Sequence, residues 1–199
     1  MSRKARMFNK KASDPKNRPD LVLNHLELQA GNIVADIGSG GGYFSLRFAE
    51  ALGKDGVVFA VDTNPGFLEF IKENAREKGL DNVKTVLTSE DSLSLPENVD
   101  LVFMRNVCHH IPNRTAYFGE LKNFLKEGGH IAILEYRKAN HFTFHGLFGH
   151  YIPKEEILTE MTQAGFQLEK DLDFLPEQSF TIFSIKLPKK RPDYTRSHI

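Results

Sequence analysis

VADIGSGGGYFSLRFA, residues 34–49, is the stretch that decides the fold of this 199-residue chain. Together with Ile33 it begins as a largely apolar run, which predicts a buried strand ending at Ile37. Four glycines then fall within residues 38–42, and apolar side chains recur beyond them at helical spacing. A strand, glycine turn and helix in this order form a nucleotide-binding corner. Glycine lets the backbone turn tightly and approach a ligand, and the helix N-terminus offers unpaired N–H groups.

The glycine spacing and an acid within the strand restrict the kind of ligand. A dinucleotide-binding turn follows the pattern G-x-G-x-x-G, and this chain has Tyr43 where the third glycine would stand. Asp36 precedes the turn, where its carboxylate would repel a pyrophosphate and attract a cationic ligand. Both observations count against an NAD-dependent dehydrogenase. On this motif alone, a glycine-rich turn in another kind of α/β protein stays an alternative.

An acid followed by G-x-G-x-G resembles the first motif of the class I S-adenosylmethionine-dependent methyltransferases. The His-rich stretch RNVCHHIP, residues 105–112, is similar to a turn in their small-molecule branch, which includes ubiquinone/menaquinone-biosynthesis and arsenite methyltransferases. The resemblance implies S-adenosyl-L-methionine as cofactor and S-adenosyl-L-homocysteine as product, and the ammonium and sulfonium of the cofactor suit a nearby acid. It implies cofactor contacts from the corner by Asp36, Gly38, Ser39, Gly40, Gly42 and Tyr43.

Length and charge favour one domain without an overall electrostatic preference. We expect a single domain at residues 19–187, a flexible basic leader at 1–18 and a frayed tail at 188–199. Lysine plus arginine and aspartate plus glutamate each number 26, so no net field attracts nucleic acid or an anionic membrane. The leader alone is basic; it could contact RNA or an anionic substrate, or simply be solvated.

Cysteine content and hydropathy bear on the compartment. The single cysteine, Cys108, excludes an intrachain disulfide and is compatible with a reducing compartment. No apolar run approaches the roughly 20 residues of a membrane span, and the first residues lack a secretory apolar region. These features predict a cytoplasmic protein without a membrane span, acting as a monomer or homodimer.

Alternating strand and helix patterns predict an α/β fold. Strands are expected at 33–37, 57–61, 83–87, 100–104, 130–136, 166–172 and 179–187, and helices at 21–28, 43–52, 65–78, 113–126 and 153–165. The last two strands are expected to form an antiparallel hairpin at the sheet edge. The resemblance implies a Rossmann-like, doubly wound sheet of seven mostly parallel strands in the order 3-2-1-4-5-7-6. Its last strand is antiparallel, and helices cover both faces.

Acids after the second and third strands are further candidates for cofactor binding. Asp62 follows the last glycine of the turn by 20 residues, close to the usual spacing for a carboxylate that binds ribose hydroxyls. It could instead cap the helix that starts near Pro65. Thr63 is placed with it in the cofactor site. The resemblance implies that Glu90 or Asp91 accepts a hydrogen bond from the adenine amino group, and the spacing leaves the choice open.

Residues 105–112 follow the fourth strand and should face the reacting groups, because ligands of open parallel sheets bind beyond the carboxyl ends of the strands. Arg105 and Asn106 are candidate cofactor contacts. Arg105, His109 and His110 are candidate catalytic residues, with packing or capping as the alternative for each histidine. His109 could act as a base, because an unperturbed histidine titrates near pH 6.5, and a base helps when the acceptor is a hydroxyl or an acidic C–H.

The aromatic and histidine-rich segment 141–152 predicts a substrate lid that includes His145, His150 and Tyr151. Its histidines do not follow a recognised zinc spacing, so no metal is predicted. Residues 105–108 do not match the Asn/Asp-Pro-Pro-aromatic turn of related enzymes that methylate base amines, and one cysteine cannot form an arsenite-binding trithiolate. A small-molecule acceptor is therefore favoured. An RNA-directed methyltransferase that uses the leader, or a non-catalytic S-adenosylmethionine-binding partner protein, stays an alternative.

Overall fold

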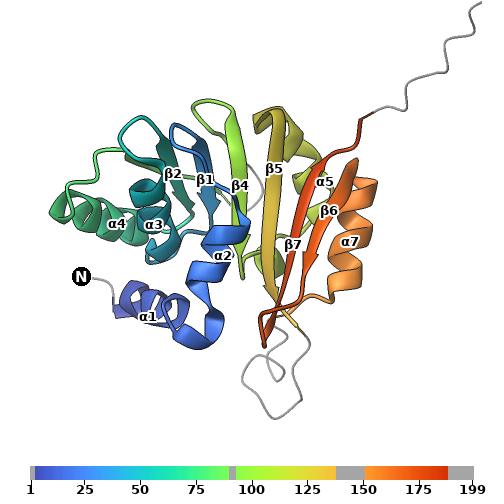
Figure 1. Ribbon diagram of the computed structural model, residues 1–199, viewed down its shortest axis with the longest axis horizontal. Coiled ribbons are helices and arrows are strands. Elements are labelled where there is room, and N and C mark those ends of the chain that lie inside the picture. Colours follow the sequence, from blue (N-terminus) through green and yellow to red (C-terminus); the bar gives the residue numbers. More distant parts are fainter. Residues whose placement is uncertain (1–2, 90–92, 138–150, 188–199) are drawn as a thin grey trace, which may run out of the picture.

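The computed structural model describes residues 3–89, 93–137 and 151–187 and contains one seven-stranded sheet, shown in Figure 1. The strands are β1 Ile33–Ile37, β2 Val57–Asp62, β3 Val83–Leu87, β4 Val99–Arg105, β5 Leu125–Tyr136, β6 Phe166–Leu172 and β7 Gln178–Ile185. The helices are α1 Arg3–Ala12, α2 Pro19–His25, α3 Tyr43–Leu52, α4 Pro65–Glu77, α5 Arg114–Leu121 and α7 Lys154–Gln163. Short 3₁₀ turns lie at η1 Pro15–Asn17, η2 Cys108–His110 and η3 Lys122–Phe124.

The strand order confirms the predicted topology: β3-β2-β1-β4-β5-β7-β6. Strands β1 to β5 run parallel to one another, while β7 runs antiparallel to both β5 and β6. The chain builds outward from β1 to β3 and then restarts at β4 on the other side of β1. This reversal between β1 and β4 opens a crevice at the carboxyl ends of the strands, where ligands of such sheets bind.

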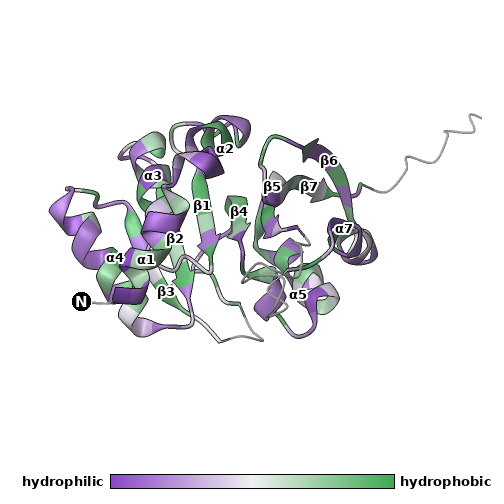
Figure 2. Ribbon diagram, turned by 90° about the horizontal axis from the view of Figure 1, so that it is seen from below, coloured by the Kyte–Doolittle hydropathy of each residue, from purple (hydrophilic) through white to green (hydrophobic). Residues whose placement is uncertain are grey.

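Helices cover both faces of the sheet and bury two apolar clusters. On one face the α3 side chains Phe44 and Phe48 pack against Phe103 of β4, with ring centroids 4.9 and 5.0 Å apart. On the other face Phe118 of α5 and Met161 of α7 are fully buried against the sheet. Figure 2 shows the hydrophobic central strands between α2 and α3 on one side and α5 on the other. Burial on both faces explains why these strands read as continuous apolar runs.

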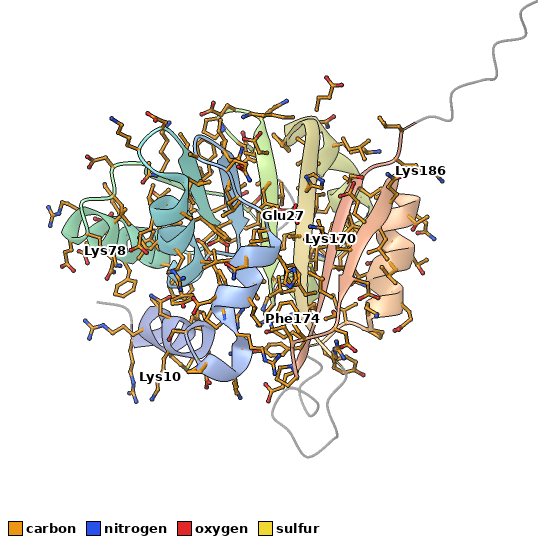
Figure 3. All side chains as sticks on the ribbon, viewed as in Figure 1. Lys10, Glu27, Lys78, Lys170, Phe174 and Lys186 are labelled. Carbon is orange, nitrogen blue, oxygen red and sulfur yellow. The ribbon has the colours of Figure 1, made fainter. Side chains whose placement is uncertain are left out.

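Helix α2 contacts the β6 edge of the sheet. Glu27, just after this helix, pairs with Lys170 of β6 at 2.6 Å, and Figure 3 labels both residues. His25 stacks on Phe174 with ring centroids 5.0 Å apart. The ion pair is exposed, so we attribute the position of α2 mainly to apolar burial, including Val22, which is 1% exposed.

One predicted helix end is wrong. The pattern placed a helix over 113–126 that ends at two glycines, but α5 ends at Leu121 and β5 already begins at Leu125. Leu125 pairs with Val99 of β4, and the register then shifts. The strand pairing with β4 therefore overrides local helix propensity, which is a weak determinant.

The N-terminal segment also differs from expectation. The predicted flexible leader is largely helical: α1 buries Ala5 and Ala12, and it lies below the carboxyl ends of β1 and β2 in Figure 1. Its basic residues are exposed, while the side chain of Asn9 bonds to the glycine turn after β1. The buried residues are two alanines, Phe8 packs beside them against Phe67 of α4, and Asn9 bonds to the glycine turn; the run of basic residues in this segment does not predict these contacts.

Within the described ranges, no helix combines the length and hydropathy that crossing a bilayer requires. Most of the predicted lid, residues 141–150, and the predicted tail, residues 188–199, lie outside the described residues.

Candidate cofactor and acceptor site

The glycine turn after β1 is packed too closely for side chains. The N–H groups of Gly38 and Ser39 both donate to the carbonyl oxygen of Val61, at 2.9 and 3.0 Å, which ties the ends of β1 and β2 together. Gly38 has φ 71°, and a Cβ there would lie 2.6 Å from Val107. A Cβ on Gly41 would lie 2.2 Å from Oδ1 of Asn9. The backbone itself therefore forms this wall of the site.

Asp36 lies beneath the first turn of α3. Its carboxylate is 4% exposed and accepts a hydrogen bond from the Ser45 hydroxyl at 2.5 Å. Burial raises the pKa of Asp36 to about 7, and the nearby Asp62 charge adds to that rise, while the Ser45 hydrogen bond and Arg105 oppose it. The acid is thus poised to ionise when a cation approaches.

Asp62 ends β2 and joins that strand to the glycine turn. Its Oδ2 accepts from the Gly40 N–H at 2.8 Å, and its Oδ1 accepts from the Asn64 N–H at 2.9 Å. Burial raises the pKa of Asp62, and the backbone N–H bonds oppose this rise. The cap of α4 is Asn64, whose side chain accepts from the Gly66 and Phe67 N–H groups, so Asp62 is not needed for that role.

Helix α1 closes the outer side of the glycine turn. The Asn9 side chain donates to the Gly41 carbonyl at 2.8 Å and accepts from the Tyr43 N–H at 3.1 Å, the first amide of α3. Phe8 packs edge-on against Phe67 of α4, with centroids 5.6 Å apart. Figure 2 shows α1 in front of the strand ends, beside α3 and α4.

A cavity of about 710 Å³ runs along the carboxyl ends of the strands, from the end of β2 to the turn after β4. The predicted site residues that line it are Asp36, Gly38, Ser39, Gly40, Tyr43, Asp62, Thr63, Arg105, Asn106, His109 and His110. Gly42 does not line it; a Cβ on Gly42 would meet Ile71 of α4 at 2.5 Å, so its role here is packing. Tyr151 is described and lies outside the lining, whereas Glu90, Asp91, His145 and His150 fall outside the described residues.

Arg105 carries a positive charge into the cavity wall. Its guanidinium lies over the Phe44 ring, 5.7 Å from the centroid. Among residues 3–89, 93–137 and 151–187, no carboxylate lies within ion-pair distance of Arg105. Burial lowers the pKa of Arg105, opposed by the fields of Tyr136 and Asp36. A guanidinium in this setting can bind an anionic group of a ligand by donating hydrogen bonds to it.

Sequence reasoning missed Glu135, an acid near the end of β5. The residue is fully buried, and its Oε2 accepts from the Cys108 N–H at 3.0 Å. Its Oε1 accepts from the Tyr136 N–H at 3.0 Å and lies 3.1 Å from Nδ1 of His109. An acid inside the apolar run of the fifth strand was the available signal.

Two other side chains in the turn after β4, those of Asn106 and Cys108, have structural roles. Asn106, with φ 52°, accepts from the Gln178 side chain of β7 at 2.7 Å through its Oδ1. Cys108 is buried, and burial raises the pKa of its thiol well above the usual range, so it is a poor nucleophile. No group of three metal-ligating side chains occurs in the described part of the chain.

The lining fits S-adenosylmethionine. The cavity volume lies within the roughly 300–1,000 Å³ typical of small-molecule sites. The buried Ser39 hydroxyl has no hydrogen-bond partner in the described structure, which a ligand group could supply. Asp36 offers a carboxylate to a cation, and Asp62 keeps unused lone pairs toward hydroxyl donors.

Comparison with known proteins places these features in a family. A family model described as a methyltransferase domain matches residues 28–170. The ubiquinone/menaquinone biosynthesis C-methyltransferase UbiE of Hydrogenovibrio crunogenus is 27% identical over 158 residues, which cover 76% of this chain and 62% of the relative. That of Shewanella pealeana is 28% identical over 145 residues, covering 72% and 56%. The chain thus spans only about six-tenths of these curated relatives.

The fold has a counterpart among solved structures. A SAM-dependent methyltransferase from Aquifex aeolicus superposes with a TM-score of 0.80 at 24% identity, covering 90% of this chain and 97% of that one. At this identity the likeness supports the fold, and it extends over nearly the whole of both chains.

Proposed function

This chain belongs to the methyltransferase-domain family, and we propose that it transfers the methyl group of S-adenosylmethionine to a small-molecule acceptor. The observation that carries the proposal is the Asp62–Gly40 hydrogen bond of 2.8 Å within the cavity wall. This bond holds the Asp62 carboxylate beside the glycine turn, where it can bind the hydroxyls of a nucleoside. Asp36, on the other side of the turn, can bind the cationic amino-acid tail of the same ligand. When bound, the cofactor supplies an electrophilic sulfonium methyl group.

We assign the cofactor contacts from charge and position. Asp62 and Thr63 face the ribose hydroxyls, and Asp36 faces the ammonium group. The Ser39 hydroxyl and the glycine backbone contact the body of the cofactor. Arg105 is the candidate partner of the cofactor carboxylate. Glu90 or Asp91, beyond Thr88 and Ser89 of the cavity wall, is the proposed partner of the adenine amino group.

The acceptor occupies the end of the cavity near the turn after β4. His109, His110 and Tyr136 line this end, and residues 141–152, which include His145, His150 and Tyr151, form the proposed lid. The protein holds the acceptor in line with the methyl group at about 3–3.5 Å and excludes water, and such positioning can lower a barrier by roughly 7–11 kcal/mol. The likeness to C-methyltransferases of quinone biosynthesis supports a small organic acceptor.

Calorimetric titration tests the cofactor assignment. We expect S-adenosylmethionine and S-adenosylhomocysteine to bind in the micromolar range and NAD not to bind. Comparable affinity for NAD, or no binding of either S-adenosyl compound, would overturn the proposal. A tritiated-methyl assay on fractionated cell extract, with mass spectrometry of the labelled product, then identifies the acceptor.

The same assay separates the alternatives. Cofactor binding without label transfer to any fraction would favour a non-catalytic partner protein. Label in RNA, with binding that weakens steeply in salt and is lost when the exposed basic residues of α1 are replaced by glutamine, would favour an RNA-directed enzyme. The exposed basic residues of α1, of which Lys4 and Lys11 line the cavity, are the observation behind that second candidate.

A further inference from the structure

We propose that His109 and Glu135 form a proton-accepting pair, and that the acceptor is therefore a weak acid, methylated at a hydroxyl oxygen or an activated carbon. This inference rests on the proposed function and deepens it by naming the acceptor class. Glu135 acts as a positioning residue, and His109 faces the acceptor. Neither the glycine motif nor the cofactor contacts require this pair.

Glu135 is held in one orientation. Both of its oxygens accept backbone N–H bonds, one from Cys108 at 3.0 Å and one from Tyr136 at 3.0 Å. Oε1 also lies 3.1 Å from Nδ1 of His109, and the Glu135 side chain is fully buried. Backbone groups of two different segments thus fix a carboxylate against the histidine ring.

The pairing decides which ring nitrogen can accept a proton. Both oxygens of Glu135 already accept backbone N–H bonds, so we assign the carboxylate as the acceptor toward Nδ1 of His109, which places the basic lone pair on Nε2. The His109 side chain is 9% exposed and lines the cavity. The buried carboxylate also stabilises the imidazolium that forms on proton uptake, as in other acid–histidine pairs.

His109 also compensates the buried carboxylate of Glu135. Burying a carboxylate is costly unless its bonds and charge are compensated. Within the described residues, His109 is the only side chain in ion-pair contact with Glu135.

The step balances without another reagent. The acceptor O–H or C–H bond breaks, its proton goes to Nε2 of His109, and its electron pair forms the bond to the methyl carbon. The methyl–sulfur bond breaks, and its electron pair stays on sulfur, which becomes a neutral thioether. The imidazolium then releases its proton to solvent.

Nitrogen-15 NMR of the histidine rings provides a test that does not depend on activity. We expect His109, assigned by the signal lost in His109→Gln, to be the Nδ1-protonated tautomer, and Glu135→Gln to increase the Nε2-protonated form because an amide can donate to Nδ1. An Nε2-protonated His109 in the unaltered protein would overturn the proposal.

Label transfer to the active extract fraction provides the second test. His109→Gln should slow single-turnover transfer at least 100-fold, while the S-adenosylhomocysteine dissociation constant stays within about twofold. Glu135→Gln should slow it at least tenfold; if that variant does not fold, His109→Gln alone decides. A methyl group found on nitrogen or sulfur, or an unchanged rate in His109→Gln, would overturn the inference.

A second histidine–glutamate pair supplies matched controls. His130 lies midway along β5, pairs with Glu169 at 2.8 Å and is outside the cavity. His130→Gln and Glu169→Gln should leave the transfer rate and the His109 tautomer unchanged. If the unaltered protein does not bind S-adenosylhomocysteine, the proposed function fails. That result is distinct from an Nε2-protonated His109, which overturns only the further inference.

Discussion

Asn9 of α1 bonds to Gly41 of the glycine turn, 32 residues later in the chain, through an amide N–H donated to the carbonyl oxygen at 2.8 Å. The same side chain accepts from the first amide of α3 at 3.1 Å. One asparagine therefore satisfies both a turn carbonyl and a helix N-terminal N–H. The N-terminal helix is thereby part of the wall around the cofactor site.

Asn9→Ala should destabilise the fold and weaken cofactor binding. Two partly buried hydrogen bonds, one of them a helix cap, are lost, and we expect a decrease of about 1–2 kcal/mol in the free energy of unfolding in urea. Lys10→Ala is the control, because Lys10 lies on the exposed side of α1 (Figure 3). Equal unfolding free energies for the two variants would contradict the assigned role.

Gly41→Ala should displace α1 from the turn. The added Cβ would lie 2.2 Å from Oδ1 of Asn9 and 2.3 Å from the Ala5 carbonyl oxygen, and only backbone movement relieves the second contact. We expect a loss of about 1–3 kcal/mol in stability and faster proteolysis within residues 1–18. Gly119→Ala is matched to it: this helix site has open space, so alanine should stabilise by roughly 0.5–1 kcal/mol. A Gly41→Ala protein as stable as the parent would refute the tight contact.

Asp62→Ala should weaken S-adenosylhomocysteine binding more than tenfold, because a charge-assisted bond to a hydroxyl is worth roughly 1.5–3 kcal/mol. Titration calorimetry measures the change. Asp81→Asn is the control, since Asp81 is exposed and precedes β3 at the opposite end of the sheet. Unchanged affinity in a folded Asp62→Ala protein would remove the ribose assignment.

The raised pKa of Asp36 predicts a pH dependence of both stability and binding. Because its pKa is about 7 in the folded state against 3.8 as the ordinary value, the folded state binds more protons between these limits. The Asp36 contribution to stability is present below the lower value and is lost as pH rises through the upper one. The difference in stability between the parent and Asp36→Asn should follow this course in urea titrations at successive pH values.

Binding of a cationic ligand should show the converse. Affinity for S-adenosylmethionine should increase from pH 6 to 8 as Asp36 ionises, with proton release on binding at the lower pH. Asp36→Asn should show neither effect. Methylthioadenosine, which lacks the ammonium group, serves as the control ligand; an equal pH dependence for that compound would argue against the Asp36–ammonium contact.

Arg105→Met should weaken S-adenosylhomocysteine binding by roughly 10- to 100-fold, the range expected for a charge-assisted hydrogen bond. Methylthioadenosine also lacks the carboxylate, so its affinity should not change. Because the guanidinium is buried without an ion pair in the described structure, the ligand-free variant should be at least as stable as the parent. Equal losses of affinity for both ligands would argue against a contact between Arg105 and the cofactor carboxylate.

Much of the fold could be predicted because its patterns are local. Apolar runs, glycines and amphipathic spacing located β1 at residues 33–37 and β3 at 83–87, and the motif resemblance supplied the strand order. The end of α5 could not be predicted, because Leu125 pairs with Val99 of β4 and so belongs to a strand, although the local sequence favours a helix there. Local propensity does not record which strand will be the neighbour.

The sequence alone determined the strand–glycine–helix corner and the acids that flank it, because those residues are adjacent in the chain or follow at a fixed spacing. Only the tertiary structure decided that α1 covers the corner, that Ser45 bonds to Asp36, and that Glu135 is aimed at His109. These contacts join residues 9 to 32 positions apart through side chains whose types are common on any surface. Their meeting depends on the crossing of strands and helices at the carboxyl end of the sheet, and hydrophobic periodicity carries no information about such polar encounters.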